Sequence, residues 1–211
     1  GAGGGPGADR SDAILRAGEQ IPGEVYQEGD LIRVYVVDVH RSNRGPQIFV
    51  SRTHPNLVRR LFELEVPEIA DGLVEVRNIA REPGSRTKIA VRAAQEGIDP
   101  VGACVGPRGG RVGAIVNELH GEKMDIITWS EDPCQYVAAA LSPALLEPVP
   151  GQKACRVVVP DDQLSLAIGK EGQNARLAAR LTSYKIDIKP ASKASEFSEA
   201  APESEPIMPE E

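Results

Sequence analysis

Apolar and β-branched positions cluster early in the chain in two short runs that are typical of paired strands. Residues 31–39 are rich in Val, Ile and Tyr, and they follow the turn sequence Glu28-Gly29-Asp30. A second turn at 42–46 leads to residues 47–51, which can return as a partner strand. The pattern predicts a hairpin in a small sheet or barrel within residues 13–52.

The spacing then becomes helical, and strands follow. The predicted elements, in order, are a helix at 54–69, strands at 74–82 and 85–93, a helix at 99–106, a helix from about 111 and a strand at 123–129. Asp99-Pro100 is a typical helix start, with Asp as the cap and Pro in the first turn. In the second strand, alternation places Lys88 on the face away from the apolar positions.

The same order of elements then repeats. The predicted elements are a helix at 132–141, strands at 145–149 and 154–159, helices at 161–169 and 173–182, and a strand at 184–189. A shift of 63 residues lays Val105-Gly106-x-x-Gly109 on Ile168-Gly169-x-x-Gly172, which indicates an internal duplication. We expect Asp161 and Asp162 to cap the helix that they begin.

Composition bounds the class of protein. A chain of 211 residues with 41% apolar content can form two or three small domains. The net charge is −7, but residues 191–211 hold six Glu and one Lys, a net −5, so residues 1–190 carry only −2. No apolar run approaches the roughly 20 residues that span a bilayer, and the Gly-rich start is unlike a signal peptide. We therefore expect a cytoplasmic protein without a membrane partner.

Motifs for catalysis and metal binding are missing from the sequence. Cys104, Cys134 and Cys155 form no Cys-x-x-Cys pair, which argues against a zinc knuckle and suits a reducing compartment. Gly169-Lys170 lacks the upstream Gly and the following Ser or Thr of a P-loop. We expect no enzymatic activity, no catalytic or metal-binding residue, and no cofactor.

Two tight Gly-x-x-Gly turns carry the most informative chemistry. Gly106-Pro107-Arg108-Gly109 and Gly169-Lys170-Glu171-Gly172 each join two predicted helices. Glycines permit a sharp turn and the close approach of another backbone. The helix that follows presents N–H groups and the positive end of its dipole, so a phosphodiester could pack against the glycines.

The loops and the order of elements resemble the K homology (KH) fold in its type II form, in which such a loop holds about four nucleotides of single-stranded RNA. The resemblance implies that the loop glycines bind RNA, and cations on or beside the loops and along the second helix can meet phosphates. The predicted RNA-binding residues are Gly106, Pro107, Arg108, Gly109, Arg111, Gly169, Lys170, Glu171, Gly172, Gln173, Asn174, Arg176 and Arg180. Gln173 and Asn174 could alternatively cap their helix. The bases would lie in a groove lined by residues such as Val105, Ile115 and Ile168.

Longer segments resemble the NusA family of bacterial transcription factors. They include Ser51-Arg52-Thr53-His54-Pro55 and residues 65–72, 80–91 and 160–180, and the resemblance extends over about 20–190. It implies an OB-fold followed by two KH domains, which together bind single-stranded nascent RNA. It also implies RNA polymerase and other elongation factors as partners, in transcription termination, antitermination and regulation.

The expected fold is therefore α+β and multi-domain, with a partial OB-fold and two type II KH domains of order αββααβ. The expected domains are a flexible Gly-rich segment at 1–12, a partial OB-fold at 13–52, KH domains at 53–130 and 131–190, and a disordered acidic tail at 191–211. We expect a monomer, and we expect Arg52 and His54 to form a structural junction between the OB and KH parts.

Two alternatives stay open at the level of sequence. The KH units could serve as a protein-interaction scaffold with little RNA binding, which Glu171 and the acidic tail favour weakly. The tail could also compete with RNA for the basic helix face.

Overall fold

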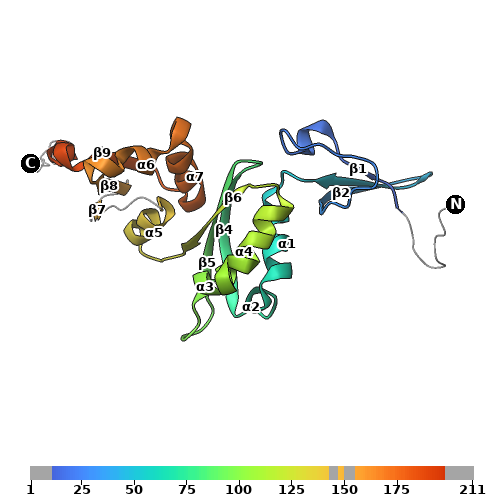
Figure 1. Cartoon of the computed structure of the whole chain (residues 1–211), viewed down its shortest axis with the longest axis horizontal. Coiled ribbons are helices and arrows are strands. Elements are labelled where there is room, and N and C mark those ends of the chain that lie inside the picture. Colours follow the sequence, from blue (N-terminus) through green and yellow to red (C-terminus); the bar gives the residue numbers. More distant parts are fainter. Residues whose placement is uncertain (1–10, 143–146, 150–154, 198–211) are drawn as a thin grey trace, which may run out of the picture. The chain divides into compact units, whose positions relative to one another are not determined.

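The computed structural model describes residues 11–142, 147–149 and 155–197 (Figure 1). The chain divides into two compact units, Gly1–Ile126 and Ile127–Glu211. The first holds a small three-stranded sheet followed by a three-stranded sheet with helices, and the second holds another three-stranded sheet with helices. The fold is thus α+β, as the sequence predicts.

The N-terminal sheet is the OB-like part of the first unit. Strands β1 (Ala13–Ile14), β2 (Tyr35–Ser42) and β3 (Gly45–Ser51) lie in the order β1-β3-β2. The antiparallel pairing of β2 with β3 confirms the predicted hairpin, although β2 begins at Tyr35 rather than at residue 31. An OB-fold has five strands, so the three strands found among residues 11–51 agree with the expectation of a partial one.

The rest of the first unit has the KH order of elements. Its elements are α1 (Pro55–Glu65), α2 (Pro67–Ala70), β4 (Val74–Glu82), β5 (Arg86–Ala93), α3 (Pro100–Val105), α4 (Gly110–Glu118) and β6 (Lys123–Thr128). The strands lie in the order β4-β5-β6, and Phe62, Ile89 and Ile115 meet in the core between helices and sheet. The single helix predicted over 54–69 is wrong, because Pro67 has no N–H and forces Val66 out of the helical region (φ −114°, ψ 101°).

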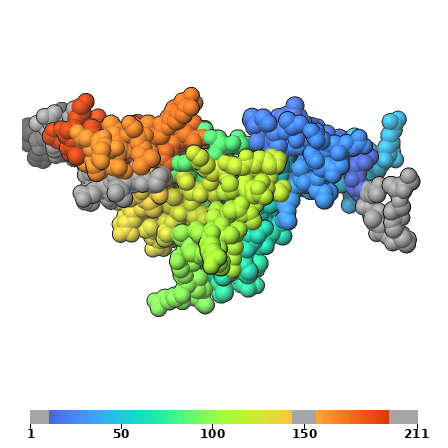
Figure 2. Space-filling model, viewed as in Figure 1, coloured from blue at the N-terminus to red at the C-terminus, as the bar shows by residue number. Residues whose placement is uncertain are grey.

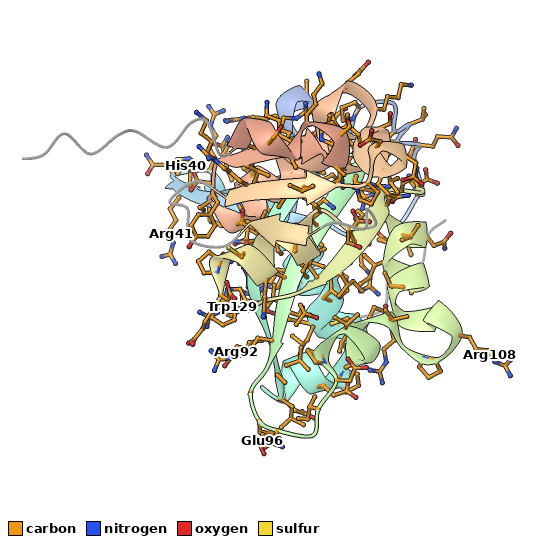
Figure 3. The ribbon with its side chains drawn as sticks, turned by 90° about the vertical axis from the view of Figure 1, so that its left-hand side faces the viewer. His40, Arg41, Arg92, Glu96, Arg108 and Trp129 are labelled. Carbon is orange, nitrogen blue, oxygen red and sulfur yellow. The ribbon has the colours of Figure 1, made fainter. Side chains whose placement is uncertain are left out.

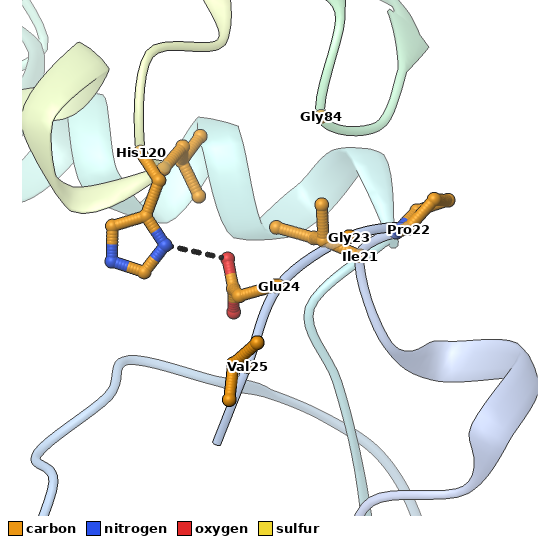
Figure 4. Close-up of a pocket in the computed structure, with 8 residues that line it drawn as sticks. Ile21, Pro22, Gly23, Glu24, Val25, Gly84 and His120 are labelled. Atoms are coloured by element: carbon orange, nitrogen blue, oxygen red, sulfur yellow. Dashed lines mark hydrogen bonds and ion pairs between the residues drawn. The ribbon is translucent and has the colours of Figure 1, made fainter. Parts of the chain in front are cut away.

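Arg52 joins the OB-like sheet to the KH part, as expected. Its side chain is fully buried, and its guanidinium donates to both carboxylate oxygens of Glu24 (2.8 and 2.9 Å) and to the Arg33 carbonyl (2.8 Å). It also bonds the Glu118 carboxylate (3.1 Å) at the end of α4. Glu24 also lines a small pocket (Figure 4), where its carboxylate lies 3.1 Å from His120 Nδ1. The pocket carboxylate is therefore part of this junction.

The second unit repeats the KH order in a shorter form. Its elements are α5 (Pro133–Ala140), β7 (Glu147–Val149), β8 (Cys155–Val159), a 3₁₀ turn at Asp161–Gln163, α6 (Leu164–Ile168), α7 (Gln173–Thr182) and β9 (Ile186–Pro190). β7 pairs antiparallel and β9 parallel with β8. The predicted helix over 173–182 is confirmed at both ends.

Two expectations about the second unit are wrong. Asp161 and Asp162 do not cap a helix, because they lie inside the 3₁₀ turn, whose N-cap is Pro160 and which has no side-chain cap. Asp161 instead accepts a hydrogen bond from the Ser192 N–H (3.0 Å), which lowers the pKa of its carboxyl group. This bond helps to order 3₁₀ turns over Ala191–Phe197, so the tail is not disordered from residue 191. The rest of the expected tail, 198–211, and residues 1–10 lie outside the described residues.

The duplication extends to the backbone itself. Among the described residues, four non-glycine residues have positive φ: Arg108 (56°), His120 (53°), Glu171 (56°) and Ser183 (60°). A shift of 63 residues maps the first two onto the last two. Both KH parts therefore share the same two unusual turns, one before and one after the second of their adjacent helices.

Candidate nucleic-acid interface

The first Gly-x-x-Gly loop is a left-handed turn between α3 and α4. Gly106 ends α3 with φ 74° and ψ 173°, and Arg108 and Gly109 both have left-handed backbone angles (φ 56° and 70°). The Gly109 N–H donates to the Gly106 carbonyl (3.1 Å), which closes the loop. In the space-filling view, the yellow-green atoms of α3 and α4 lie at the surface of the first unit (Figure 2).

The second loop has nearly the same backbone. Gly169 has φ 78° and ψ 168°, and Glu171 and Gly172 have φ 56° and 74°. The Gly172 N–H again donates to the Gly169 carbonyl at 3.1 Å. A left-handed conformation at a non-glycine residue is uncommon and costs about 1–2 kcal/mol. Its presence at Arg108 and at Glu171 makes both loops candidates for function.

The two glycines of each loop serve different purposes. A Cβ on Gly106 would lie 2.5 Å from Arg111 Cγ, and a Cβ on Gly169 would lie 2.8 Å from Asn174 Cβ. A Cβ on Gly109 or Gly172 would meet nothing within 4 Å. The first glycine therefore makes room for the protein's own helix, and only the second leaves open space where another backbone could approach.

One cation on each loop is accessible to a ligand. Arg108 is exposed and points away from the ribbon (Figure 3). Lys170 is also exposed, and among the described residues neither side chain forms an ion pair. Pro107 and Glu171, the other middle residues of the loops, are exposed as well. The loops thus differ in charge, with Arg108 at the position where the second loop has Glu171.

Two of the predicted RNA-binding residues turn inward. Arg111 donates from Nη1 to the Glu68 carboxylate (2.7 Å) and to the Ala103 carbonyl (2.8 Å). Asn174 is only 3% exposed and does not cap α7, whose N-cap is Gly172. Asn174 is therefore enclosed by the protein, whereas the Arg111 side chain is 26% exposed but bonded to other parts of its own unit.

The remaining predicted residues lie along α7. Gln173 is half-buried, and Arg176 and Arg180 are exposed one turn apart. Arg176 Nη1 donates to the Glu171 carbonyl (3.0 Å), which brings a guanidinium next to the second loop. These two arginines place positive charge along α7, next to the second loop. Helix α4 lacks this feature, since Gly113 and Asn117 stand at the equivalent positions.

The exposed apolar residues near the loops differ from those expected to line a groove for the bases. Ile115 is 1% exposed and belongs to the core, so it cannot line a groove. Ile168 is 39% exposed, and Leu166, which the sequence analysis did not select, is 45% exposed on the same short helix. Two exposed aliphatic side chains within three residues of Gly169 are the signal that could have identified this surface.

Neither thiol chemistry nor metal binding is supported near the loops. Burial raises the pKa of the Cys104 thiol on α3 to about 11, so it stays protonated at neutral pH. Within residues 11–142, 147–149 and 155–197, no cluster of His, Cys, Asp and Glu could hold a metal ion. Nor is any helix in those ranges both long and apolar enough to cross a bilayer.

Comparison with known proteins supplies the family. The sequence model of the NusA-like first KH domain matches residues 52–129, and that of the NusA-like second KH domain matches residues 133–196. The chain belongs to the NusA family. Both Gly-x-x-Gly loops fall inside these NusA-like KH matches.

Several relatives named transcription termination/antitermination protein NusA are similar to the chain. The protein of Halalkalibacterium halodurans is 58% identical over 189 residues, which are 88% of this chain and 50% of the relative. That of Bacillus subtilis is 55% identical over 206 residues (94% and 56%), and that of Mycobacterium tuberculosis 58% over 183 residues (85% and 53%). The chain therefore spans about half the length of these NusA relatives.

Proposed function

We propose that the chain binds single-stranded RNA through its two Gly-x-x-Gly loops, as the RNA-binding part of a bacterial transcription elongation, termination and antitermination factor. One observation carries this proposal. The same left-handed loop occurs twice, each time with an open second glycine and an exposed cation. The names of the NusA relatives support the role in transcription.

The geometry suits a phosphodiester backbone. Open space over Gly109 and Gly172 admits a sugar-phosphate chain, and Arg108 and Lys170 can each neutralise a phosphate. A KH loop holds about four nucleotides, so two loops would engage about eight. In the second unit, Arg176 and Arg180 can follow the backbone further along α7.

The wider assignments rest on the family. We propose a non-enzymatic cytoplasmic monomer that works with RNA polymerase and other elongation factors. The boundaries at 53–130 and 131–190 stay the proposed limits of the two KH domains. No cofactor takes part in this function.

The test is a titration of a fluorescently labelled pool of 12-nucleotide single-stranded RNAs, followed by anisotropy at two salt concentrations. Arg108→Ala/Lys170→Ala removes one cation from each loop. Arg60→Ala/Lys193→Ala, which removes two exposed cations elsewhere, is the matched control for net charge. We expect salt-sensitive binding that the loop variant weakens about tenfold or more and the control leaves nearly unchanged.

The same titration tests the scaffold alternative. Equal losses in both variants would assign binding to net charge rather than to the loops. No binding by the folded wild-type chain would overturn the proposal and favour a protein-interaction scaffold.

A further inference from the structure

The second residue of the helix after each loop has the same role in both units. Arg111 in α4 and Asn174 in α7 are 63 residues apart, the period of the duplication. They differ in size and charge, yet each packs over the first glycine of its own loop. Each also donates hydrogen bonds to two other helical segments of its own unit.

Arg111 connects three helices of the first unit. From α4 it reaches the carbonyl of Ala103 in α3 (2.8 Å) and the carboxylate of Glu68 in α2 (2.7 Å). Its Cγ would lie only 2.5 Å from a Cβ added to Gly106. The Arg111 side chain therefore packs against the first glycine of the loop and links α4 to α2 and α3.

Asn174 makes corresponding connections in the second unit, but with a neutral group and only to backbone carbonyls. Its Nδ2 donates to the carbonyls of Ala167 (2.9 Å) and Leu166 (3.4 Å) in α6, and to that of Leu141 at the end of α5 (2.9 Å). Leu166 is the residue that the 63-residue shift pairs with Ala103. Each side chain thus ties its helix to the preceding helix and to a helix that comes before the sheet, which is α2 in the first unit and α5 in the second.

We propose that Arg111 and Asn174 are positioning residues that hold the Gly-x-x-Gly loops in the RNA-binding conformation and do not themselves contact RNA. The proposal rests on the proposed function of the loops. Asn174 is 3% exposed, with all of its donor capacity directed at backbone carbonyls. Arg111 directs one guanidinium nitrogen at both an anion and a carbonyl.

Such residues affect RNA affinity because they set the fraction of molecules in which the loop has its RNA-binding conformation. When the bound conformation is only fractionally populated in the free protein, the apparent affinity falls by that fraction. The left-handed conformation at Arg108 is intrinsically unfavourable, so it needs support from the surrounding structure. If loss of the Arg111 contacts leaves loop one ordered about a tenth of the time, its RNA affinity falls about tenfold.

The salt dependence of RNA binding separates positioning from contact. For single strands, each neutralised phosphate contributes about 0.7 to the slope of log affinity against log salt. Arg108→Ala should lower that slope by about 0.7. Arg111→Ala should weaken binding about tenfold with the slope unchanged, and a drop of about 0.7 in this variant, or unchanged affinity, would overturn the proposal.

The duplication supplies a rescue variant. Arg111→Asn places in α4 the side chain that α7 uses at the equivalent backbone position. We expect it to recover most of the affinity that Arg111→Ala loses, although it carries no charge. Recovery by Arg111→Lys but not by Arg111→Asn would identify the charge as the active feature and overturn the proposal.

Hydrogen exchange tests the positioning role without RNA. The Gly109 N–H is bonded to the Gly106 carbonyl and should exchange about tenfold faster in Arg111→Ala than in wild type. The Gly172 N–H should respond in the same way to Asn174→Ala. Faster exchange without any RNA binding by the wild-type chain would refute the proposed function but support the positioning role. Unchanged exchange in both variants would overturn the positioning role.

Discussion

Replacing Glu122 by Gln should strongly destabilise the KH part of the first unit. Glu122 is fully buried directly before β6 and accepts hydrogen bonds from Arg81 (2.9 Å to Nη2), the Gly84 N–H (2.7 Å) and the Thr87 hydroxyl (2.7 Å). The side chain of Arg81 is also 0% exposed. Gln has nearly the same shape, so the substitution removes the charge and leaves the Arg81 guanidinium buried without an anion.

The expected cost follows from burial. Removing one partner of a buried ion pair costs about 3–5 kcal/mol, because the other charge stays out of water. Native-state hydrogen exchange at β5 amides such as Val91 reports this directly, since their opening requires the sheet to unfold. Exchange of these amides should accelerate by about two to three and a half powers of ten.

An exposed ion pair of similar length provides the matched control. Arg60 and Glu63 lie 2.8 Å apart on α1 with side chains 64% and 35% exposed. Glu63→Gln should change exchange of the same amides by less than about threefold, because solvent screens the pair. Equal effects of Glu122→Gln and Glu63→Gln would refute the argument from burial.

Three further predictions concern charge and burial. Burial raises the pKa of Glu24, but the hydrogen bonds and charge of Arg52 outweigh this effect and hold the pKa below the usual 4.5. The stability that Glu24 contributes is therefore fully present above about pH 5 and is lost as the pH falls through the lowered pKa. Urea unfolding against pH should therefore show a flatter acid limb in Glu24→Gln than in wild type. The buried Cys104 thiol, with its pKa of about 11, should resist iodoacetamide at pH 8 in the folded chain and react after unfolding, as mass spectrometry of the labelled peptide would show. Glu171→Arg, which copies the charge of Arg108 into the second loop, should tighten RNA binding in the anisotropy assay and steepen the salt dependence of the affinity by about 0.7. Unchanged binding would argue against a phosphate at that loop.

The repeated order of helices and strands could be predicted because it depends on local signals. Hydrophobic spacing, Asp-Pro helix starts and Gly-containing turns lie within a few residues of one another, and they placed α3 and α7 correctly. The 63-residue shift identified both loops for the same reason. The left-handed backbone of Arg108 and Glu171 could not be predicted, because neither residue type favours it.

Long-range polar contacts explain most of what the sequence did not show. Arg81 and Glu122 are 41 residues apart, and nothing local marks them as a buried pair. Strand alternation put Lys88 on the face away from the apolar positions, but its side chain is fully buried and paired with Asp125 (2.8 Å). Arg111 was predicted to bind RNA because it lies next to a loop, and its partner Glu68 is 43 residues away. Proximity in sequence identified the two loops as the candidate site but not the direction of the side chains around them.

The most direct test of RNA binding at the loops is a ¹H–¹⁵N NMR titration of the chain with a 12-nucleotide single-stranded RNA. The amides of Gly109 and Gly172 report on the open side of each loop. We predict that the largest shift changes occur at these two amides and their immediate neighbours. Binding with the largest changes elsewhere, and with both amides unmoved, would contradict the account.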